Sequence, residues 1–376
     1  MQKIHIAKED FERILALGGQ CISPTRTIPL SDYIRITGRD TNLLVEAISE
    51  ICGIRARAKV SIGVEQEVSF CIQCKQLEQF IKAVSDSEVT LEIEEDSLKI
   101  IHSDGEFTFP IVPSLDYPTL QAALDDEATA SYTVSSALLS KWLVSAKAFA
   151  ANDQLRPVIN GIYVYTEANG AIGFCAASQQ AIICDETKCE GVQAASSFII
   201  DKKAFPSILA VLKDSEEVTV TVTSKNVHFK TRNAKMVVHQ TLGKFLNFKA
   251  LYDKPTIHDV TFKRKALLDA MKRISLCCVT DGGHILISMR DNIARISFDN
   301  LAFNKKVSEV VPYEGECELS VIFALGNIEK SIAAIDTEDV LIRLYDDKRP
   351  VIINETGEGA SENKSILITP AAPVKR

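Results

Sequence analysis

The sequence predicts an α+β protein made of three similar units in tandem, each with two helices packed on one face of an antiparallel sheet. The first observation is an apolar helical stripe that begins at Phe11, Leu139 and Leu267, so that each start lies 128 residues after the previous one. The second is a helix–turn–strand pattern that also occurs three times. Three units of about 125 residues account for all 376 residues, which argues for a triplication and against a short solenoid repeat.

The helix–turn–strand pattern is clearest in the middle of the chain. Apolar residues recur at helical spacing over 198–212, an acidic turn covers 214–217, and 218–223 alternates valine with threonine as a half-buried strand does. The same pattern covers 77–93 and 328–344. We therefore expect antiparallel strands between and after six helices, at 6–17, 75–84, 135–149, 201–213, 262–274 and 326–335.

The expected domain boundaries fall where the sequence becomes polar or contains proline. Residues 115–118 and 125–127 mark the first boundary, and 252–255 mark the second. The resulting domains cover 1–124, 125–253 and 254–376.

The composition is typical of a globular protein, with 46% apolar and 24% charged residues. No run of 18 apolar residues occurs, so no transmembrane helix is expected, and residues 1–13 lack the apolar core of a signal peptide. The ten cysteines are irregularly spaced, which favours reduced thiols in a cytoplasmic protein over a disulfide framework.

Charge is distributed unevenly along the chain, whose net charge is −8. The six expected helices carry 15 basic and 7 acidic residues, a net charge of +8, which leaves −16 for the remainder. Helix propensity alone could explain the lysines, because lysine is a good helix former on any exposed face. Glutamate is an equally good helix former, however, and it is scarce in these six helices. A basic helical layer on an acidic remainder favours contact with nucleic-acid phosphates without base reading.

No catalytic site, metal site or cofactor is expected from the motifs. Cys71 and Cys74 form a Cys-x-x-Cys, but no second pair follows at ligand spacing, so structural thiols are favoured over a zinc half-site or redox pair. The six histidines lie apart from any nucleophile signature, and the glycine-rich stretch 357–361 suits a hairpin loop better than a phosphate cradle. Trp142 shares its stripe position with Ile14, which favours the core over base stacking.

Four segments carry a resemblance to a known family. Residues 107–118 and 155–161 resemble the end of the first domain and the strand that opens the second domain's sheet in the bacterial sliding clamp, the β subunit of the replicative DNA polymerase. Residues 243–248, Gly-Lys-Phe-Leu-Asn-Phe, are similar to that family's Gly-Arg-Phe-Pro-Asp-Tyr, and 366–370 are similar to its C-terminal tail. The chain, which the resemblance covers in full, is therefore identified as a divergent member of this family.

The resemblance implies a head-to-tail homodimer in which six clamp-type domains form a ring around duplex DNA, with helices lining the hole. Phe107 and Phe109 of one copy would meet Leu276 and Cys277 of the other, although both phenylalanines suit an ordinary strand core equally well. A separate ATP-driven loader would open the ring, because this chain has no nucleotide loop. The expected DNA-facing residues are Arg26, Lys75, Lys82, Lys141, Lys147, Arg156, Lys202, Lys203, Lys263, Arg264, Lys272 and Arg273.

The resemblance also implies an apolar groove for short peptide motifs of partner proteins. By position it falls on Ile159, Ala177, Gln179, Gln180, Ala181, Ile182, Leu246, Leu251, Ile368, Thr369, Pro370 and Ala371. Two departures alter it: the family's Thr-Asp-Gly-His-Arg-Leu reads Ala-Ser-Gln-Gln-Ala-Ile over 177–182, and the usual groove proline is Leu246. The preferred peptide is therefore expected to differ from the family's consensus.

The leading hypothesis is a non-enzymatic clamp that tethers the polymerase, clamp-loader subunits and other DNA-processing proteins to duplex DNA. The altered groove keeps open a second hypothesis, a clamp paralogue with a private set of partners. A third, a three-domain enzyme with a site in a cleft, has no catalytic constellation in its favour.

Overall fold

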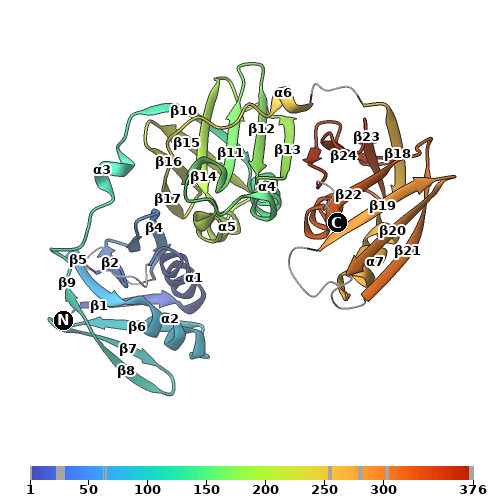
Figure 1. Ribbon diagram of the computed structural model, residues 1–376. Helices are drawn as coiled ribbons and strands as arrows, with labels where there is room; N and C mark the ends of the chain where they lie inside the picture. Colours follow the sequence, from blue (N-terminus) through green and yellow to red (C-terminus); the bar gives the residue numbers. More distant parts are fainter. Residues whose placement is uncertain are drawn as a thin grey trace. The chain divides into compact units, whose positions relative to one another are not determined.

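The computed structural model describes residues 2–22, 30–61, 63, 66–252, 256–277, 283–300 and 305–371. The chain divides into two compact units, the first made of residues 1–141, 167–170 and 189–242, the second of residues 142–166, 171–188 and 243–376. Both units combine antiparallel sheets with helices, so the predicted α+β class is confirmed (Figure 1). None of the helices in the described ranges is long and apolar enough to cross a membrane.

The first unit contains two sheets, with strand orders β1-β6-β7-β8 and β10-β15-β16-β17-β4-β3-β2-β5-β9. Its strands are β1 (Gln2–Ala7), β2 (Tyr33–Arg39), β3 (Asn42–Ile48), β4 (Cys52–Lys59), β5 (Val68–Gln73), β6 (Glu88–Ile93), β7 (Ser97–His102), β8 (Gly105–Pro110), β9 (Val112–Pro113), β10 (Ala128–Ser135), β14 (Ser196–Asp201), β15 (Glu217–Thr223), β16 (Asn226–Lys230) and β17 (Ala234–His239). Its helices are α1 (Lys8–Gly19), α2 (Cys74–Ala83), α3 (Gln121–Leu124) and α5 (Phe205–Leu212), the last preceded by a 3-10 turn over Lys202–Ala204.

In the second unit the strand order is β11-β12-β13-β25-β24-β23-β18-β21-β20-β19-β22. These strands are β11 (Gly161–Thr166), β12 (Ala171–Ala177), β13 (Ala181–Lys188), β18 (His258–Lys263), β19 (His284–Arg290), β20 (Ile293–Asn300), β21 (Lys305–Glu314), β22 (Ser320–Ala324), β23 (Asp339–Leu344), β24 (Val351–Thr356) and β25 (Ser365–Ile368). Its helices are α6 (Lys249–Tyr252), α7 (Arg264–Ser275) and α8 (Leu325–Ala333). Helix α4 (Ser136–Phe149) contributes residues to both units.

The order of the elements repeats three times along the chain. Strand, helix, four strands, helix and three strands occur as β1 to β8, as β10 to β17 and as β18 to β25. The short elements β9, α3 and α6 lie between the repeats. The six predicted helices are all present, displaced at their ends by up to four residues.

The first helix of each repeat buries the stripe that the sequence predicts. All nine stripe residues are at most 5% exposed: Phe11, Ile14 and Leu15 in α1, Leu139, Trp142 and Leu143 in α4, and Leu267, Ala270 and Met271 in α7. Trp142 packs against Phe174 with ring centroids 5.3 Å apart and donates its indole N–H to Asp185 over 3.2 Å. The expectation that this side chain belongs to the core is confirmed.

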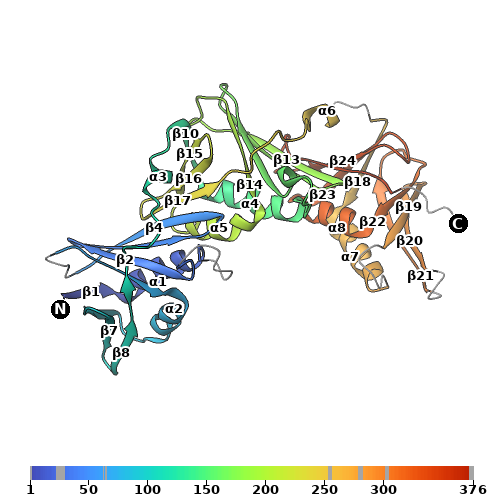
Figure 2. The same cartoon turned by 60° about the vertical axis from the view of Figure 1, so that its left-hand side comes forward.

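Two strand joins use equivalent positions of successive repeats. The last strand of the second repeat, β17, lies beside β4 of the first (Figure 2). The two strands pair antiparallel, with Met236 opposite Ile54. The last strand of the third repeat, β25, pairs in the same way with β13 of the second, with Ile366 opposite Ile183. A strand that ends one repeat therefore completes the sheet of the repeat before it.

The segment 155–161 does not open a strand as the sequence suggested. Residues Pro157–Ile159 form a 3-10 turn, and β11 begins only at Gly161. The Asp153 carboxylate accepts hydrogen bonds from the backbone N–H groups of Leu155 and Arg156, at 2.9 and 3.1 Å. This local turn and the missing N–H of Pro157 remove the donors that a strand ladder would use.

Candidate functional site

The join of β13 and β25 brings together residues far apart in the sequence. Ala181 lies opposite Ile368 in the register, and the Thr369 N–H donates to the Gln180 carbonyl over 2.9 Å. The Gln180 side chain accepts a hydrogen bond from the Asn327 amide at 2.6 Å. Strand β25 thus holds the C-terminal groove candidates against the turn that precedes β13.

The remaining groove candidates lie on two nearby segments of the same unit. The Ala151 N–H donates to the carbonyls of both Ile159 and Ala177, at 2.9 and 3.2 Å. Leu246 and Leu251 belong to the segment 245–252, which is anchored at one end by the stacking of Phe245 on Tyr163, with centroids 4.8 Å apart.

At its other end, this segment is tied directly to the β13–β25 join. The Tyr252 hydroxyl donates to the Ser365 carbonyl over 3.2 Å. It also lies 3.7 Å from the Cys184 sulfur. The segment that carries Leu246 and Leu251 is therefore fixed to both strands of the join.

Exposure separates the twelve groove candidates into a framework and an accessible set. Six are buried: Ile159, Ala177, Ala181, Ile182, Ile368 and Pro370. The accessible set comprises the exposed Gln179, Gln180 and Thr369 and the half-buried Leu246, Leu251 and Ala371. A ligand that contacts the accessible set would meet two half-buried leucines and three exposed polar side chains. Protein interfaces commonly combine apolar and polar groups in this way.

A pocket that the sequence did not predict lies on the same unit. It has a volume of about 340 Å³ and includes none of the twelve groove candidates; its lining residues are Tyr165, Cys184, Asp185, Glu186, Phe248, Lys249, Tyr252, Glu362, Asn363 and Ser365. The Tyr165 hydroxyl donates to Glu186 over 2.7 Å, and the Lys249 ammonium lies 5.0 Å from the centre of the Tyr165 ring. The sequence signal available for this pocket was the pair of aromatic residues Phe248 and Tyr252.

The helix cations differ in whether they already have a partner. Lys82 binds Glu78 over 2.6 Å, Lys263 binds Asp339 over 2.9 Å, and Arg273 makes a two-point contact with Glu309. Lys75, Lys147, Lys203 and Lys272 are exposed and have no carboxylate partner within the described residues. An unpaired exposed ammonium keeps its full attraction for an external anion, so these four are the better phosphate-binding candidates.

Arg26 and Arg156 were both expected to face DNA, and the structure describes only Arg156. Arg156 is bound by the Asp153 carboxylate, with its Nε and Nη2 atoms 2.9 and 2.8 Å from Oδ2. This contact uses the geometry that a phosphate would need. Arg26 lies outside the described residues.

The interface candidates lie at two places with exposed apolar side chains. On β8, the edge of its sheet, Phe107 is 49% exposed and Phe109 is buried, and both pack against Phe80 at centroid distances of 5.0 and 5.5 Å. Leu276, directly after α7, is 83% exposed, and Cys277 beside it is half-buried. Phe109 is therefore strand core, whereas Phe107 offers a surface.

The thiols of the Cys-x-x-Cys pair are buried and held neutral. Burial raises the pKa of Cys71 to about 11 and that of Cys74 to about 12. No cluster of three or more potential ligands that would hold a metal ion occurs among the described residues. Because only the thiolate ligates metals or attacks disulfides, the pair has the character of core thiols.

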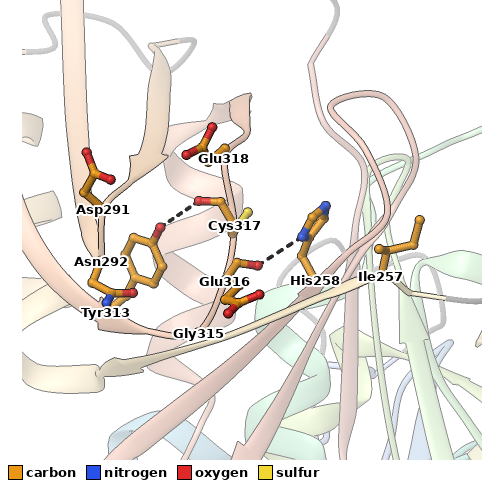
Figure 3. A pocket seen from close by; sticks show the side chains of 9 residues that line it. All are labelled: Ile257, His258, Asp291, Asn292, Tyr313, Gly315, Glu316, Cys317 and Glu318. Atoms are coloured by element: carbon orange, nitrogen blue, oxygen red, sulfur yellow. Dashed lines mark hydrogen bonds between the residues drawn. The ribbon is translucent and has the colours of Figure 1, made fainter.

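A larger pocket, of about 570 Å³, lies on the third repeat (Figure 3). The Tyr313 hydroxyl donates to the Cys317 carbonyl over 2.7 Å, and the Nδ1 of His258 lies 3.1 Å from the Glu316 carbonyl. The tyrosine and the histidine of this pocket are therefore both engaged with backbone carbonyls.

Comparison with known proteins gives consistent results for sequence and for fold. Residues 2–121 match the family described as the N-terminal domain of the DNA polymerase III beta subunit. A beta sliding clamp of Rickettsia bellii is 20% identical over 373 residues, covering 94% of this chain and 96% of the relative. One from Haemophilus influenzae is 22% identical and covers 89% of this chain and 88% of the relative.

Solved structures share the fold along the whole chain. The DNA polymerase III beta subunit of Thermotoga maritima superposes with a TM-score of 0.89 at 18% identity and covers 100% of both chains. A sliding clamp from Pseudomonas aeruginosa, solved with griselimycin bound, gives a TM-score of 0.90 at 15% identity and covers 99% of both chains. The predicted fold of three clamp-type units is confirmed by this likeness.

Proposed function

Since this chain is a divergent member of the DNA polymerase III beta subunit family, we propose that it acts as a sliding clamp. Two copies would join head to tail, encircle duplex DNA and keep a polymerase attached to it. The observation that carries the proposal is the strand join made twice within the chain, by β17 with β4 and by β25 with β13. In both joins the last strand of one repeat pairs with the third of the four strands that lie between the two helices of another repeat. The last strand of the first repeat, β8, has no such partner among the described strands of its own chain.

The equivalent partner for β8 is β21 of a second copy. Strand β21 pairs with β20 along its length but with β18 only through Thr261 and Phe262, which leaves most of its other edge open among the described strands. Val310 on β21 is 57% exposed, and Phe107 on β8 is 49% exposed. Pairing β8 with β21 in both directions closes a symmetric dimer and covers strand edges that would otherwise stay exposed.

The three domains of the proposed clamp are residues 1–124, 125–253 and 254–376. The threefold repeat of the element order supports these boundaries, because the short elements β9, α3 and α6 fall between the repeats. Within the first unit, α1 and α5 lie side by side, as the Ser207 hydroxyl donates to the Gln20 carbonyl over 2.8 Å. We propose that these helices and their counterparts in other repeats face the DNA through exposed lysines.

Partner proteins would bind through short peptides at the β13–β25 join, in the cytoplasm where bacterial DNA lies. The accessible leucines Leu246 and Leu251 would take the apolar residues of the peptide. The Pseudomonas aeruginosa clamp of the same fold was solved with a ligand, griselimycin, bound to it. The clamp itself would catalyse no reaction, so that processivity comes from the closed ring and from weak, salt-screened phosphate contacts.

The test combines solution mass with retention on DNA. Light scattering over a dilution series should give a species of about twice the 41.3 kDa of one chain. Clamp loaded onto a nicked circle should remain bound through gel filtration and should be lost once the circle is cut to a linear molecule. Equal retention on both DNA forms would contradict encirclement, and a persistent monomer would contradict unaided closure.

A further inference from the structure

A strongly basic pocket lies on the sheet of the first unit, where β4 pairs with β17. It has a volume of about 310 Å³, and five of its nine lining residues are cations: Arg55, Arg57, Lys230, Arg232 and Lys235. We infer that this pocket is a docking site for an acidic segment of a partner protein. The inference is independent of the proposed groove and of the helices proposed to face DNA.

The pocket lies on the sheet face opposite α1. Helix α1 packs on β3 and β4, and the alternating residues Ile54, Ala56 and Ala58 of β4 are buried on that side. Side chains of a strand alternate between faces, so Arg55 and Arg57 project from the opposite face.

The partner strand follows the same alternation. On β17, Ala234 and Met236 are buried, and Lys235 lies between them, directly opposite Arg55 in the register. Two cations are therefore paired across the join, where opposite charges would be the stabilising choice. Like charges opposite each other lower stability unless an anion offsets them, and of these two cations only Arg55 has a carboxylate beside it, that of Glu46.

Backbone carbonyls hold two of the cations in place. The Arg57 guanidinium donates to the Arg232 carbonyl over 3.0 Å, and the Lys235 ammonium donates to the Leu124 carbonyl over 3.3 Å. These contacts orient the side chains without neutralising them. A ligand would thus meet cations whose positions are already partly fixed, which reduces the entropy lost on binding.

Only one of the five cations has a carboxylate partner within the described ranges. Arg55 binds Glu46 over 2.8 Å, and the same carboxylate also binds Arg35. Arg57, Lys230, Arg232 and Lys235 have no ion-pair partner among the described residues. The pocket therefore carries an excess of positive charge within a chain whose net charge is −8.

The lining favours carboxylates over a nucleic-acid strand. Guanidinium groups bind carboxylates and phosphates through two parallel hydrogen bonds. Single-stranded nucleic acid is additionally held by bases stacked on aromatic rings, and none of the nine lining residues is aromatic. The small volume also suits a few acidic side chains better than nucleotides.

The test uses the full-length protein and a fluorescent eight-residue peptide of alternating aspartate and glutamate, followed by anisotropy at two salt concentrations. The variant Lys230→Gln with Arg232→Gln removes two exposed pocket cations. Lys59→Gln with Lys225→Gln makes the same charge change at exposed positions outside the pocket. We expect the pocket variant to weaken peptide binding at least tenfold and the control variant to change it less than twofold.

Other outcomes overturn the inference. If the peptide does not bind, or if both double variants weaken it equally, the cations act only as general surface charge. If a single-stranded octamer of thymidylate binds the unmodified protein more tightly than the peptide does and loses affinity in the pocket variant alone, the pocket is a nucleic-acid site. Circular dichroism of both variants confirms that the fold is retained.

Discussion

The ammonium of Lys364 lies 2.8 Å from the Glu355 carboxylate, and both side chains are only 3% exposed. Lys364 also binds Asp336 over 2.9 Å, and the Ser361 N–H donates to Glu355 over 2.9 Å. The Ser361 hydroxyl in turn donates to Asp185, which accepts the indole N–H of Trp142. This buried network connects the loop before β25 to α4 within the second unit.

Replacing Lys364 by methionine should destabilise the second unit by about 3–5 kcal/mol, because Glu355 would stay buried without its cation. Trp142 is the only tryptophan and is buried, so its fluorescence reports unfolding of this unit in urea. Lys348→Met, at an exposed lysine of the same unit, is the matched control and should change the midpoint little. Similar midpoints for both variants would show that the buried pair is dispensable.

The ion pair of Lys364 and Glu355 also predicts that the stability of the folded protein depends on pH. Burial by itself would raise the pKa of Glu355, but hydrogen bonds from Lys364, Ser361 and Asp336 outweigh it and hold the pKa below its usual value of 4.5. A carboxyl with a lowered folded-state pKa contributes stability above its unfolded pKa and loses that contribution as the pH falls through the folded value.

Glu355→Gln should therefore unfold at a lower temperature than the unmodified protein at pH 7, and the gap should narrow below about pH 4.5. Thermal unfolding followed by Trp142 fluorescence at pH 7, 5 and 3.5 measures this gap. A gap of constant size across that range would show that Glu355 does not titrate as expected.

Leu276→Glu should weaken the proposed dimer at least tenfold, because it would place a charge in the β8–β21 interface. The side chain is 83% exposed, so the change should leave the folding of one chain intact. Leu155→Glu is the control, because Leu155 is 93% exposed and lies outside the proposed interface. Light scattering over a dilution series measures how readily the dimer of each variant dissociates. Equal dissociation of the two variants would show that Leu276 does not lie in the interface.

Lys147→Gln with Lys203→Gln should reduce affinity for duplex DNA and lower the slope of log K against log salt by about two. Both lysines are exposed and lack a carboxylate partner in the described ranges. The control, Lys82→Gln with Lys263→Gln, removes lysines already paired with carboxylates and should have a smaller effect. A larger loss of DNA affinity in the control variant would mean that the ion pairs of Lys82 and Lys263 open when DNA binds.

Leu251→Asp should weaken binding of a peptide from the organism's own replicative polymerase at least tenfold, since a charge would replace an apolar contact of the proposed groove. Leu242→Asp is the control, because Leu242 is 70% exposed and is not a groove residue. Fluorescence anisotropy of a labelled peptide provides the measurement. Unchanged affinity in Leu251→Asp would place the peptide elsewhere, for example in the pocket around Tyr252.

The helices were predictable because their signal is local. The stripe beginning at Phe11 recurs at Leu139 and Leu267, and burial of all three follows from the 3.6-residue period alone. The prediction of a strand over 155–161 was wrong because it followed the family resemblance. The local signal for a turn was Asp153, whose side chain accepts hydrogen bonds from the backbone just before Pro157. Turn chemistry of this kind depends on one hydrogen-bonding side chain and leaves no periodic pattern.

The basic pocket could not be predicted from a count of charges. Arg57 and Arg232 are 175 positions apart and meet only because β4 pairs with β17. Pairing between distant strands depends on register, which the sequence of either strand alone does not specify. The helical cations, in contrast, were visible as a compositional bias within single elements.

The repeated strand join has a consequence for how the proposed assembly comes apart. The β4–β17 and β13–β25 joins hold segments of one chain, and the intervening polypeptide keeps their partners at an effective concentration in the millimolar range. A β8–β21 join between copies has no such tether and depends on the amount of protein in solution. Dilution would therefore separate the copies at the two β8–β21 joins and nowhere else. Opening the ring would require breaking only one of these two joins, with the joins inside each chain left intact.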